Sequence, residues 1–221
     1  MTRALISVAA WLLATSCTCS RVTEPFPVER VGSSECQGEQ ASLCASRANA
    51  LLEGDTIEGV EEARRLFGLA CDGGSMSSCG MYGGMLVKGE GGPVDLEPGL
   101  DLLRRHCSSR DRHSHLSCYD LGYAYANGDP SELGQDLLQG LTYFERACGP
   151  QDAEACQAAA RLVTSDQMKE PDLARGASLA QRACRYGSQS ACADLEEAIP
   201  KWREACAEGV ETACEGVKVA E

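Results

Sequence analysis

The sequence predicts an all-α fold built as a solenoid of stacked helix pairs, and two observations lead to this prediction. First, twelve of the fourteen cysteines form six neighbouring pairs, at positions 36/44, 71/79, 107/118, 148/156, 184/192 and 206/214. The first cysteine of each pair recurs after 35, 36, 41, 36 and 22 residues. Second, small and apolar residues keep fixed distances from these cysteines, in the register of a helix face. A period near 36 residues is typical of helix-pair repeat proteins.

Residues 1–16 have the features of a signal peptide. Arg3 supplies a positive charge, and ALISVAAWLLAT (4–15) is an apolar stretch too short to span a bilayer comfortably. ATSC (14–17) resembles a bacterial lipobox, in which Cys17 would be diacylated and become the mature N-terminus, although Ala14 stands where leucine is preferred. Cleavage and release without a lipid is the alternative. We expect no second membrane-spanning stretch.

Residues 17–35 are predicted to be a flexible tether, because they are polar, contain two prolines and show no helical stripe of apolar residues. Cys19 is left over in this segment and receives no role. The repeat domain is expected over 36–221. The net charge of the full chain is −13. Because such a protein repels nucleic acid and anionic membrane surfaces, we expect no nucleic-acid partner and no membrane contact other than the lipid anchor.

The segment before the first cysteine of a pair reads as one helix of each repeat, here called helix B. Examples are EEARRLFGLAC, EPGLDLLRRHC, LQGLTYFERAC and ARGASLAQRAC. A small residue lies eight positions before the cysteine, and mostly apolar residues lie five and four positions before it. These offsets follow one face of an α-helix.

The segment after the second cysteine reads as the other helix, helix A, most clearly in CYDLGYAYANG (118–128). The residue four positions after the second cysteine is small in every full repeat. Because glycine inside a helix costs about 1 kcal/mol relative to alanine, its recurrence there predicts that two helix backbones approach closely. Glycines ten positions after the second cysteine predict left-handed helix ends at Gly54, Gly89 and Gly128. Asp166 breaks this rule, and the shortened last repeat predicts short closing helices.

The skeleton LGYAYANGDP…GLTYFERAC resembles the Sel-one-like (SLR) repeat, a relative of the tetratricopeptide repeat, and the added cysteine pairs resemble its Hcp-type, cysteine-rich branch. The resemblance covers about 180 residues. It is looser in the fourth repeat, where CQAAARLVTSD lacks the tyrosine and glycine. It implies a right-handed α/α solenoid of about four to five helix pairs and an exported bacterial protein.

The paired cysteines are interpreted as disulfide staples across the turn from helix B to the next helix A. A hairpin brings such positions within reach, and closing a nine-residue loop stabilises by about 2.5 kcal/mol. The expected bridges are Cys36–Cys44, Cys71–Cys79, Cys107–Cys118, Cys148–Cys156, Cys184–Cys192 and Cys206–Cys214. The alternatives fit less well, because the expected mature chain, from Cys17 on, lacks a Cys-x-x-Cys redox motif and the pairs lie too far apart in sequence to converge on zinc.

All three histidines, His106, His113 and His115, lie beside the longest cysteine pair. They could chelate a metal, but their irregular spacing in a lengthened turn favours a polar surface loop. We therefore expect no metal and no cofactor.

Some Hcp-type relatives are described as penicillin-binding or β-lactamase proteins, so a hydrolase is the alternative function. The required serine with a lysine three residues later is missing, as are Lys-Thr-Gly and His-x-His-x-Asp. The Tyr-x-Asn of Tyr125–Asn127 belongs to the repeat skeleton. No catalytic residue is assigned.

The favoured function is an exported, non-catalytic scaffold that binds a protein or peptide partner in the cell envelope as a monomer. Stacked helix pairs curve and leave a concave surface lined by A helices, where such arrays hold extended segments. Asn49, Tyr123 and Asn127 are the candidate contacts, and the acidic charge favours a basic or neutral partner. Each of them could equally be a solvated residue.

Overall fold

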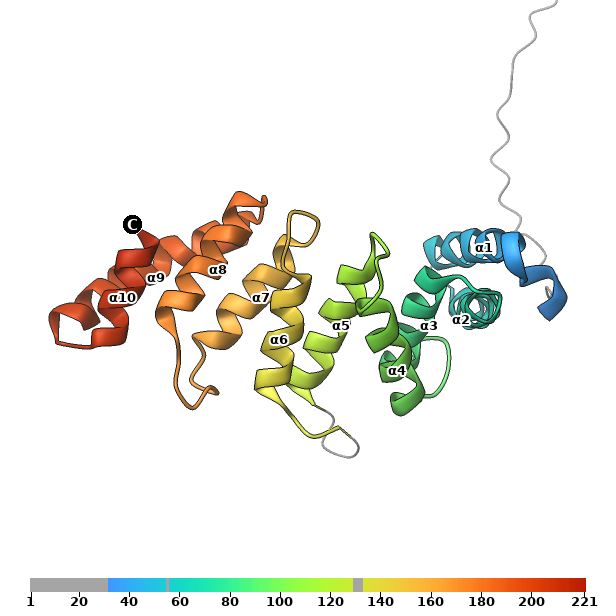
Figure 1. Ribbon diagram of the computed structural model, residues 1–221, viewed down its shortest axis with the longest axis horizontal. Coiled ribbons are helices and arrows are strands. Elements are labelled where there is room, and N and C mark those ends of the chain that lie inside the picture. The colour runs from blue at the N-terminus through green and yellow to red at the C-terminus, as the bar shows by residue number, and fades with distance from the viewer. Residues whose placement is uncertain (1–31, 55, 129–132) are drawn as a thin grey trace, which may run out of the picture. The chain divides into compact units, whose positions relative to one another are not determined.

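The computed structural model describes residues 32–221 apart from residue 55 and residues 129–132 (Figure 1). The predicted signal peptide, Cys17 and Cys19 therefore lie outside the described residues. In the described part, two short 3₁₀ helices precede ten α-helices and no strand forms. The helices are α1 (Ala41–Glu53), α2 (Ile57–Asp72), α3 (Met76–Lys88), α4 (Leu96–Cys107), α5 (Ser114–Asn127), α6 (Leu137–Ala147), α7 (Ala153–Val163), α8 (Leu173–Arg185), α9 (Gln189–Ala207) and α10 (Glu211–Ala220).

The helices pack as a row of pairs in chain order (Figure 1). The A helices α1, α3, α5 and α7 each pack on the B helix that follows, and each B helix packs on the next A helix. Helix α9 starts as an A helix and ends as a B helix, while α10 packs on α8 and α9. The all-α solenoid predicted from the cysteine period is confirmed.

Side-chain caps explain where most of the helices begin. A Ser, Thr or Asp side chain accepts a hydrogen bond from the backbone N–H three residues later, which satisfies a donor that the helix leaves free. The capping residues are Thr56, Ser75, Asp136, Asp152, Asp172 and Ser188.

The predicted left-handed helix ends are confirmed at one of three glycines. Gly89 ends α3 with φ 70° and ψ 23°, the left-handed conformation that glycine adopts at low cost. Gly128 also has a positive φ of 65°, but its ψ of 164° lies outside the left-handed helical region. The prediction is wrong for Gly54, where φ is −76° because the last turn of α1 tightens and the Gly54 N–H bonds to the carbonyls of Leu51 and Leu52.

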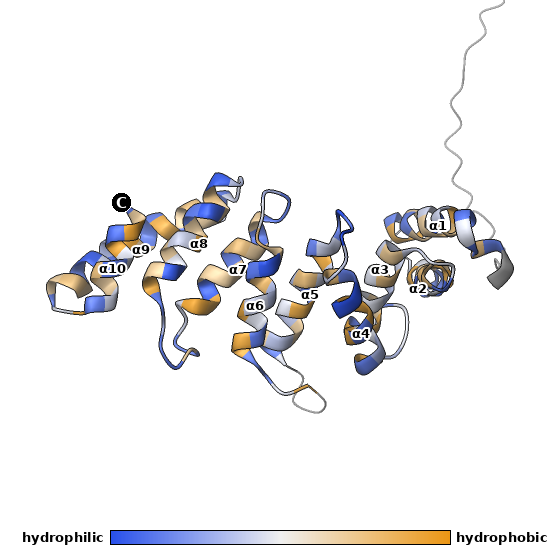
Figure 2. Ribbon diagram, in the orientation of Figure 1, coloured by the Kyte–Doolittle hydropathy of each residue, from blue (hydrophilic) through white to orange (hydrophobic). Residues whose placement is uncertain are grey.

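Hydrophobic and hydrophilic residues alternate along the helices (Figure 2), and apolar residues of the register read from the sequence are buried. In helix B, the residue four positions before the cysteine is buried in every full repeat. These residues are Phe67, Leu103, Phe144 and Ala180. Helices α3 and α4 also come close at their glycines, since a Cβ on Gly83 would lie 2.9 Å from the Gly99 carbonyl oxygen, and a Cβ on Gly99 equally close to that of Gly83. The predicted backbone approach is confirmed at this crossing.

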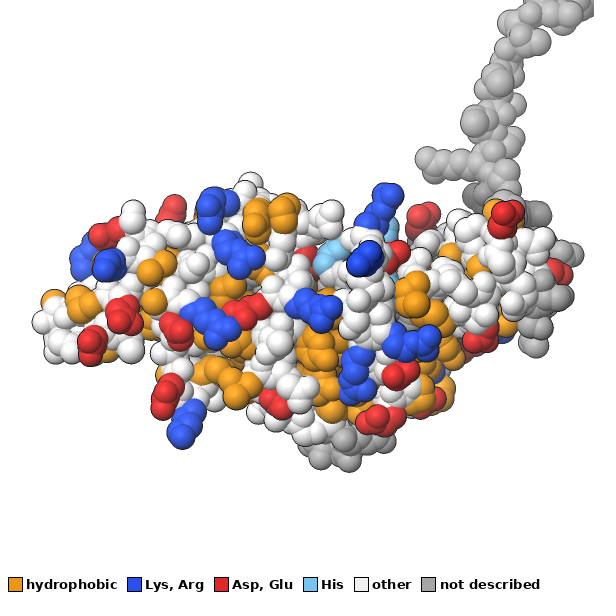
Figure 3. All heavy atoms as spheres, viewed as in Figure 1, with side chains coloured by type: hydrophobic (Ala, Val, Ile, Leu, Met, Phe, Trp, Pro, Cys, Tyr) orange, Lys and Arg blue, Asp and Glu red, His pale blue; other side chains and the backbone are white. Residues whose placement is uncertain are grey.

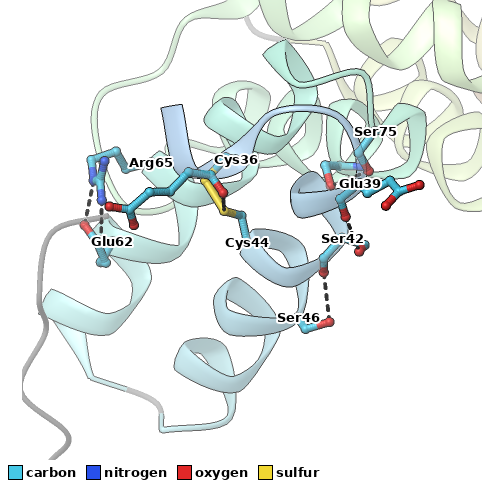
Figure 4. Close-up of a disulfide and its surroundings, with 10 residues drawn as sticks. Cys36, Glu39, Ser42, Cys44, Ser46, Glu62, Arg65 and Ser75 are labelled. Atoms are coloured by element: carbon cyan, nitrogen blue, oxygen red, sulfur yellow. Dashed lines mark hydrogen bonds and ion pairs between the residues drawn. A yellow bond between two sulfur atoms is a disulfide. The ribbon is translucent and has the colours of Figure 1, made fainter. Parts of the chain in front are cut away.

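Six disulfides join the neighbouring cysteines, with Cα–Cα distances between 4.4 and 5.7 Å. In five of them the first cysteine ends one helix and the second lies in the first two turns of the next. The exception is Cys36, which lies in a 3₁₀ helix and fastens it to α1 through Cys44 (Figure 4). The disulfides therefore staple the array at every turn from one repeat to the next. Beside the first disulfide, the Ser42 hydroxyl also donates a hydrogen bond to the Glu39 carbonyl oxygen at 2.9 Å.

The closing segment differs from the short helices predicted for it. Helix α9 runs for 19 residues and contains Pro200 in its interior. Proline removes one backbone hydrogen bond and usually breaks a helix. Here the cysteines Cys192 and Cys206 are too close in sequence for a loop between an A and a B helix, so both merge into one helix. Only α10, with ten residues, is short. No described helix has the length and apolar character needed to cross a membrane.

Candidate functional site

The A-helix face is defined here as the surface formed by residues one, two, five and nine positions after the second cysteine on helices α1, α3, α5, α7 and α9. Hollows open between successive A helices on this face. In each hollow, one A helix contributes residues one, five or nine positions after its second cysteine. The next A helix contributes the residue two positions after its own second cysteine. The register of the repeats therefore places these three hollows at corresponding positions on their A helices.

The first hollow, of about 240 Å³, lies over α1, α3 and α5. It includes the predicted contact residue Asn49, which is exposed. Apolar side chains also line it, with Met81 38% and Leu116 46% exposed. Its floor contains Gly80, where a Cβ would overlap the His106 ring.

The second hollow, of about 290 Å³, lies between α3 and α5 and contains the other two predicted contact residues. Tyr123 is 57% exposed, and the Asn127 side-chain amide donates to the Tyr123 carbonyl oxygen at 2.9 Å. Gly84 forms its floor, and a Cβ there would lie 3.1 Å from an oxygen of Asp120. Asp120 lines both hollows, so they adjoin.

Two ion pairs that the sequence analysis missed cross between A helices. The Lys88 ammonium group lies 2.9 Å from an oxygen of Asp120. The Arg161 guanidinium lies 2.8 Å from Asp194 in α9, and Gln157 donates to the same oxygen at 2.7 Å. The hydrogen bond from Arg161 lowers the pKa of Asp194. Burial lowers the pKa of Lys88, but the attraction of Asp120 outweighs it and the net direction is upward.

Negative charge gathers around Tyr119 in α5. Burial, followed by the charges of Glu154, Asp152 and Asp120, raises the pKa of the Tyr119 phenol. The pKa of Asp152, which caps α7, is also raised, mainly by burial. These carboxylates make this part of the A-helix face favourable for a cation.

The three histidines do not form a metal-binding group in the described part of the chain, although His106 and His113 both lie near the same oxygen of Asp111. His106 is buried, and its Nδ1 lies 2.8 Å from the Ser117 hydroxyl. Its Nε2 lies 3.4 Å from Asp111, whose pKa is lowered chiefly by a hydrogen bond from the His113 backbone N–H. The His113 side chain is 57% exposed, while His115 bonds to a loop carbonyl. The surface-loop interpretation is therefore wrong for His106, because its ring fills the space left by Gly80. Across the described residues, no three His, Cys, Asp or Glu side chains form a metal-binding group.

The Tyr-x-Asn element is part of the packing. Tyr125 is only 6% exposed, and its hydroxyl accepts a hydrogen bond from Arg104 at 2.7 Å. Its ring stacks on that of Tyr143 with centroids 5.6 Å apart. The tyrosine therefore fixes α5 to its neighbours and does not face either hollow.

Comparison with known proteins gives relatives in sequence and in fold. No family model matches the chain. It is 26% identical over 137 residues to cytochrome c oxidase assembly factor 7 of Xenopus tropicalis, covering 61% of this chain and 59% of the relative. To the Mus musculus protein of that name it is 30% identical over 109 residues, covering 46% and 47%. The chain thus spans about half the length of the curated relatives it matches.

A Sel1 repeat protein from Oxalobacter formigenes has a similar solved structure. The TM-score is 0.57 at 18% sequence identity, and the match covers 78% of this chain and 75% of that chain. This likeness shows the fold, an SLR-type helical-repeat array, and agrees with the resemblance read from the repeat skeleton.

Proposed function

We propose that this chain is an exported, non-catalytic helical-repeat scaffold that binds a protein or peptide partner along its A-helix face. The observation that carries the proposal is the pair of adjoining hollows over α1, α3 and α5. The exposed side chains of Met81, Leu116 and Tyr123 line these hollows. Groups of exposed apolar side chains commonly mark a surface that binds another protein. Repeat arrays use such extended surfaces to bind other chains.

Export is part of the proposal and is supported by the disulfides. Six bridges form and persist in an oxidising compartment, and cytosolic reductants would keep such thiols reduced. The signal-like residues 1–16 agree with this location. Diacylation of Cys17 would anchor the scaffold in the cell envelope as a monomer, with residues 17–35 as its tether.

A scaffold is favoured over the hydrolase alternative. The curated relatives carry the name of an assembly factor, and we take over from that name only the role of binding other proteins. The Tyr-x-Asn element that would serve a hydrolase is occupied in packing through Tyr125. On the face drawn in Figure 3, acidic and basic side chains are interspersed with apolar ones, which suits a mixed protein surface as the partner.

Site-specific photocrosslinking in the producing cells tests the scaffold. A benzoylphenylalanine at Tyr123 is expected to crosslink one partner, whereas the same group at Leu138 is not. Leu138 is a matched control, because it is also apolar and exposed, at 67%, and lines the separate hollow of about 620 Å³ between α6 and α8. Crosslinking at Leu138 alone would move the binding surface to that hollow. Hydrolysis of nitrocefin by the purified chain would contradict a non-catalytic role.

The lipid anchor is tested separately. Metabolic labelling with palmitate should mark the wild-type protein, and the variant Cys17→Ala should carry no label. Label that persists in that variant, or a wild-type protein that carries no label, would contradict lipidation at Cys17 without touching the scaffold.

A further inference from the structure

We infer that the second hollow binds a lysine or arginine side chain of the partner, flanked by apolar residues, with Asp120 as its counter-ion in place of Lys88. The inference rests on the proposed scaffold function and specifies the chemistry of the segment that the A-helix face takes.

The size and lining of the second hollow fit one long side chain and its apolar neighbours. Its volume of about 290 Å³ is at the lower end for ligand pockets, so it suits part of a peptide better than a complete small molecule. Val87, Val94 and Leu133 line it beside Tyr123. The methylene stem of a lysine or arginine packs on such apolar surface while its charged end reaches a carboxylate.

The charge around Asp120 favours a cation from outside. Among the described residues its cation partner is Lys88, whose side chain is 46% exposed and is held by one 2.9 Å contact. The Asp120 side chain itself is 22% exposed, so a partner can reach it. Asp152 and Glu154 add negative charge close to Tyr119. Lys88 is thus the cation that the structure pairs with Asp120, and this pair is exposed enough to exchange for another.

The corresponding position in the last repeat is already occupied. Asp194 has the same register as Asp120, two residues after the second cysteine. It accepts from the Arg161 Nε at 2.8 Å, from the Arg161 Nη2 at 2.8 Å and from the Gln157 amide at 2.7 Å. The hollow there measures only about 80 Å³. Asp194 is therefore a matched control for Asp120.

Labelled nonapeptide libraries test the inference on the full chain. The flanking positions vary over Val, Leu and Tyr, and the central residue is Lys, Gln or Glu. We expect the Lys library to bind more tightly than the Gln library, on the order of three- to fivefold, as for one partly exposed ion pair. Asp120→Asn should abolish this preference, whereas Asp194→Asn should keep it.

The variant Lys88→Met separates binding from a structural role of the ion pair. If Lys88 holds the place of a partner cation, its removal frees Asp120. The Lys library should then bind the Lys88→Met variant more tightly than it binds the wild type. If the pair only fastens α3 to α5, Lys88→Met and Asp120→Asn should weaken binding together, and the inference is overturned. Circular dichroism of both variants checks that they fold.

The remaining outcomes separate this inference from the scaffold itself. A preference for the Glu library overturns the inference. Libraries that do not bind, together with a partner crosslinked at Tyr123, overturn it and leave the scaffold standing. Failure of both measurements removes the scaffold as well.

Discussion

The close approach of α3 and α4, at Gly83 and Gly99, predicts that Gly83→Ala destabilises the fold, although helix propensity alone predicts stabilisation. In an exposed helix, Gly→Ala stabilises by about 1 kcal/mol. In Gly83→Ala the new Cβ would lie 2.9 Å from the Gly99 carbonyl oxygen and 3.0 Å from the Leu102 Cβ. These are backbone and near-backbone atoms, so α3 and α4 must separate. Overpacking of this kind costs about 1–3 kcal/mol, and we expect a net loss of roughly 1 kcal/mol.

Gly68→Ala is the matched control, also a Gly→Ala change inside a helix. Its nearest atoms belong to the Tyr82 ring, 3.3 to 3.5 Å away, and a ring at the end of a side chain can turn aside. We expect this variant to be as stable as the wild type or more stable, by up to about 1 kcal/mol.

The two glycine variants are compared by guanidinium unfolding followed by circular dichroism, with the disulfides intact. Because repeat arrays can open one unit at a time, hydrogen exchange is measured as well. Amides of α3 and α4 should exchange faster in Gly83→Ala, while those of α8 should not change. A Gly83→Ala protein that unfolds at the wild-type midpoint or above it, with unchanged exchange, would refute the close approach.

Three further predictions concern the staples, an ion pair and a buried hydroxyl. Replacing Cys148 and Cys156 together by alanine opens a nine-residue loop and should lower the unfolding free energy by about 2.5 kcal/mol; an unchanged midpoint would contradict the stapling role. Asp194→Asn should cost about 1 kcal/mol or less at pH 7, since the carboxylate is 40% exposed. The hydrogen bond from Arg161 lowers the pKa of Asp194, so the charged carboxylate stabilises the fold above about pH 4. The difference in unfolding free energy between wild type and Asp194→Asn should therefore vanish as the pH falls through the lowered pKa. A difference that is constant with pH would refute this. Tyr125→Phe removes the acceptor for its arginine donor and should cost about 1–2 kcal/mol in urea unfolding, against no change if the hydroxyl served only a ligand.

Much of the fold could be predicted because each cysteine marks a place in its helix. Counting from these marks identified the buried face of helix B, including Phe67 and Leu103, and the close approach at Gly83. The end of α1 could not be predicted this way, because a glycine permits a left-handed turn without requiring it, and Gly54 stays right-handed. The continuous α9 was missed because the short spacing between Cys192 and Cys206 was taken to shorten the helices, whereas in the structure it removes the loop between them. The helix packs on α8 and α10 and continues through Pro200.

The sequence predicted the face on which the candidate contact residues lie, but not the shape of that face. Counting along helix A brought Asn49, Tyr123 and Asn127 to one face, and the structure places them in two hollows on that face. The ion pairs were missed because their partners lie about one repeat apart in sequence and do not share a register: Lys88 is nine residues after its cysteine, whereas Arg161 is five after its own.

That difference in register explains why one hollow is open and the other nearly filled. Four residues are about one helical turn, so Lys88 reaches its aspartate from one turn further along α3 than Arg161 does along α7. The position that Arg161 holds in α7 is Gly84 in α3, where no side chain fills the space beside Asp120. The hollows accordingly measure about 80 Å³ beside Arg161 and about 290 Å³ above Gly84. An alignment of the repeats shows a glycine at this position, but only the placement of the next A helix shows that its missing side chain leaves an open hollow.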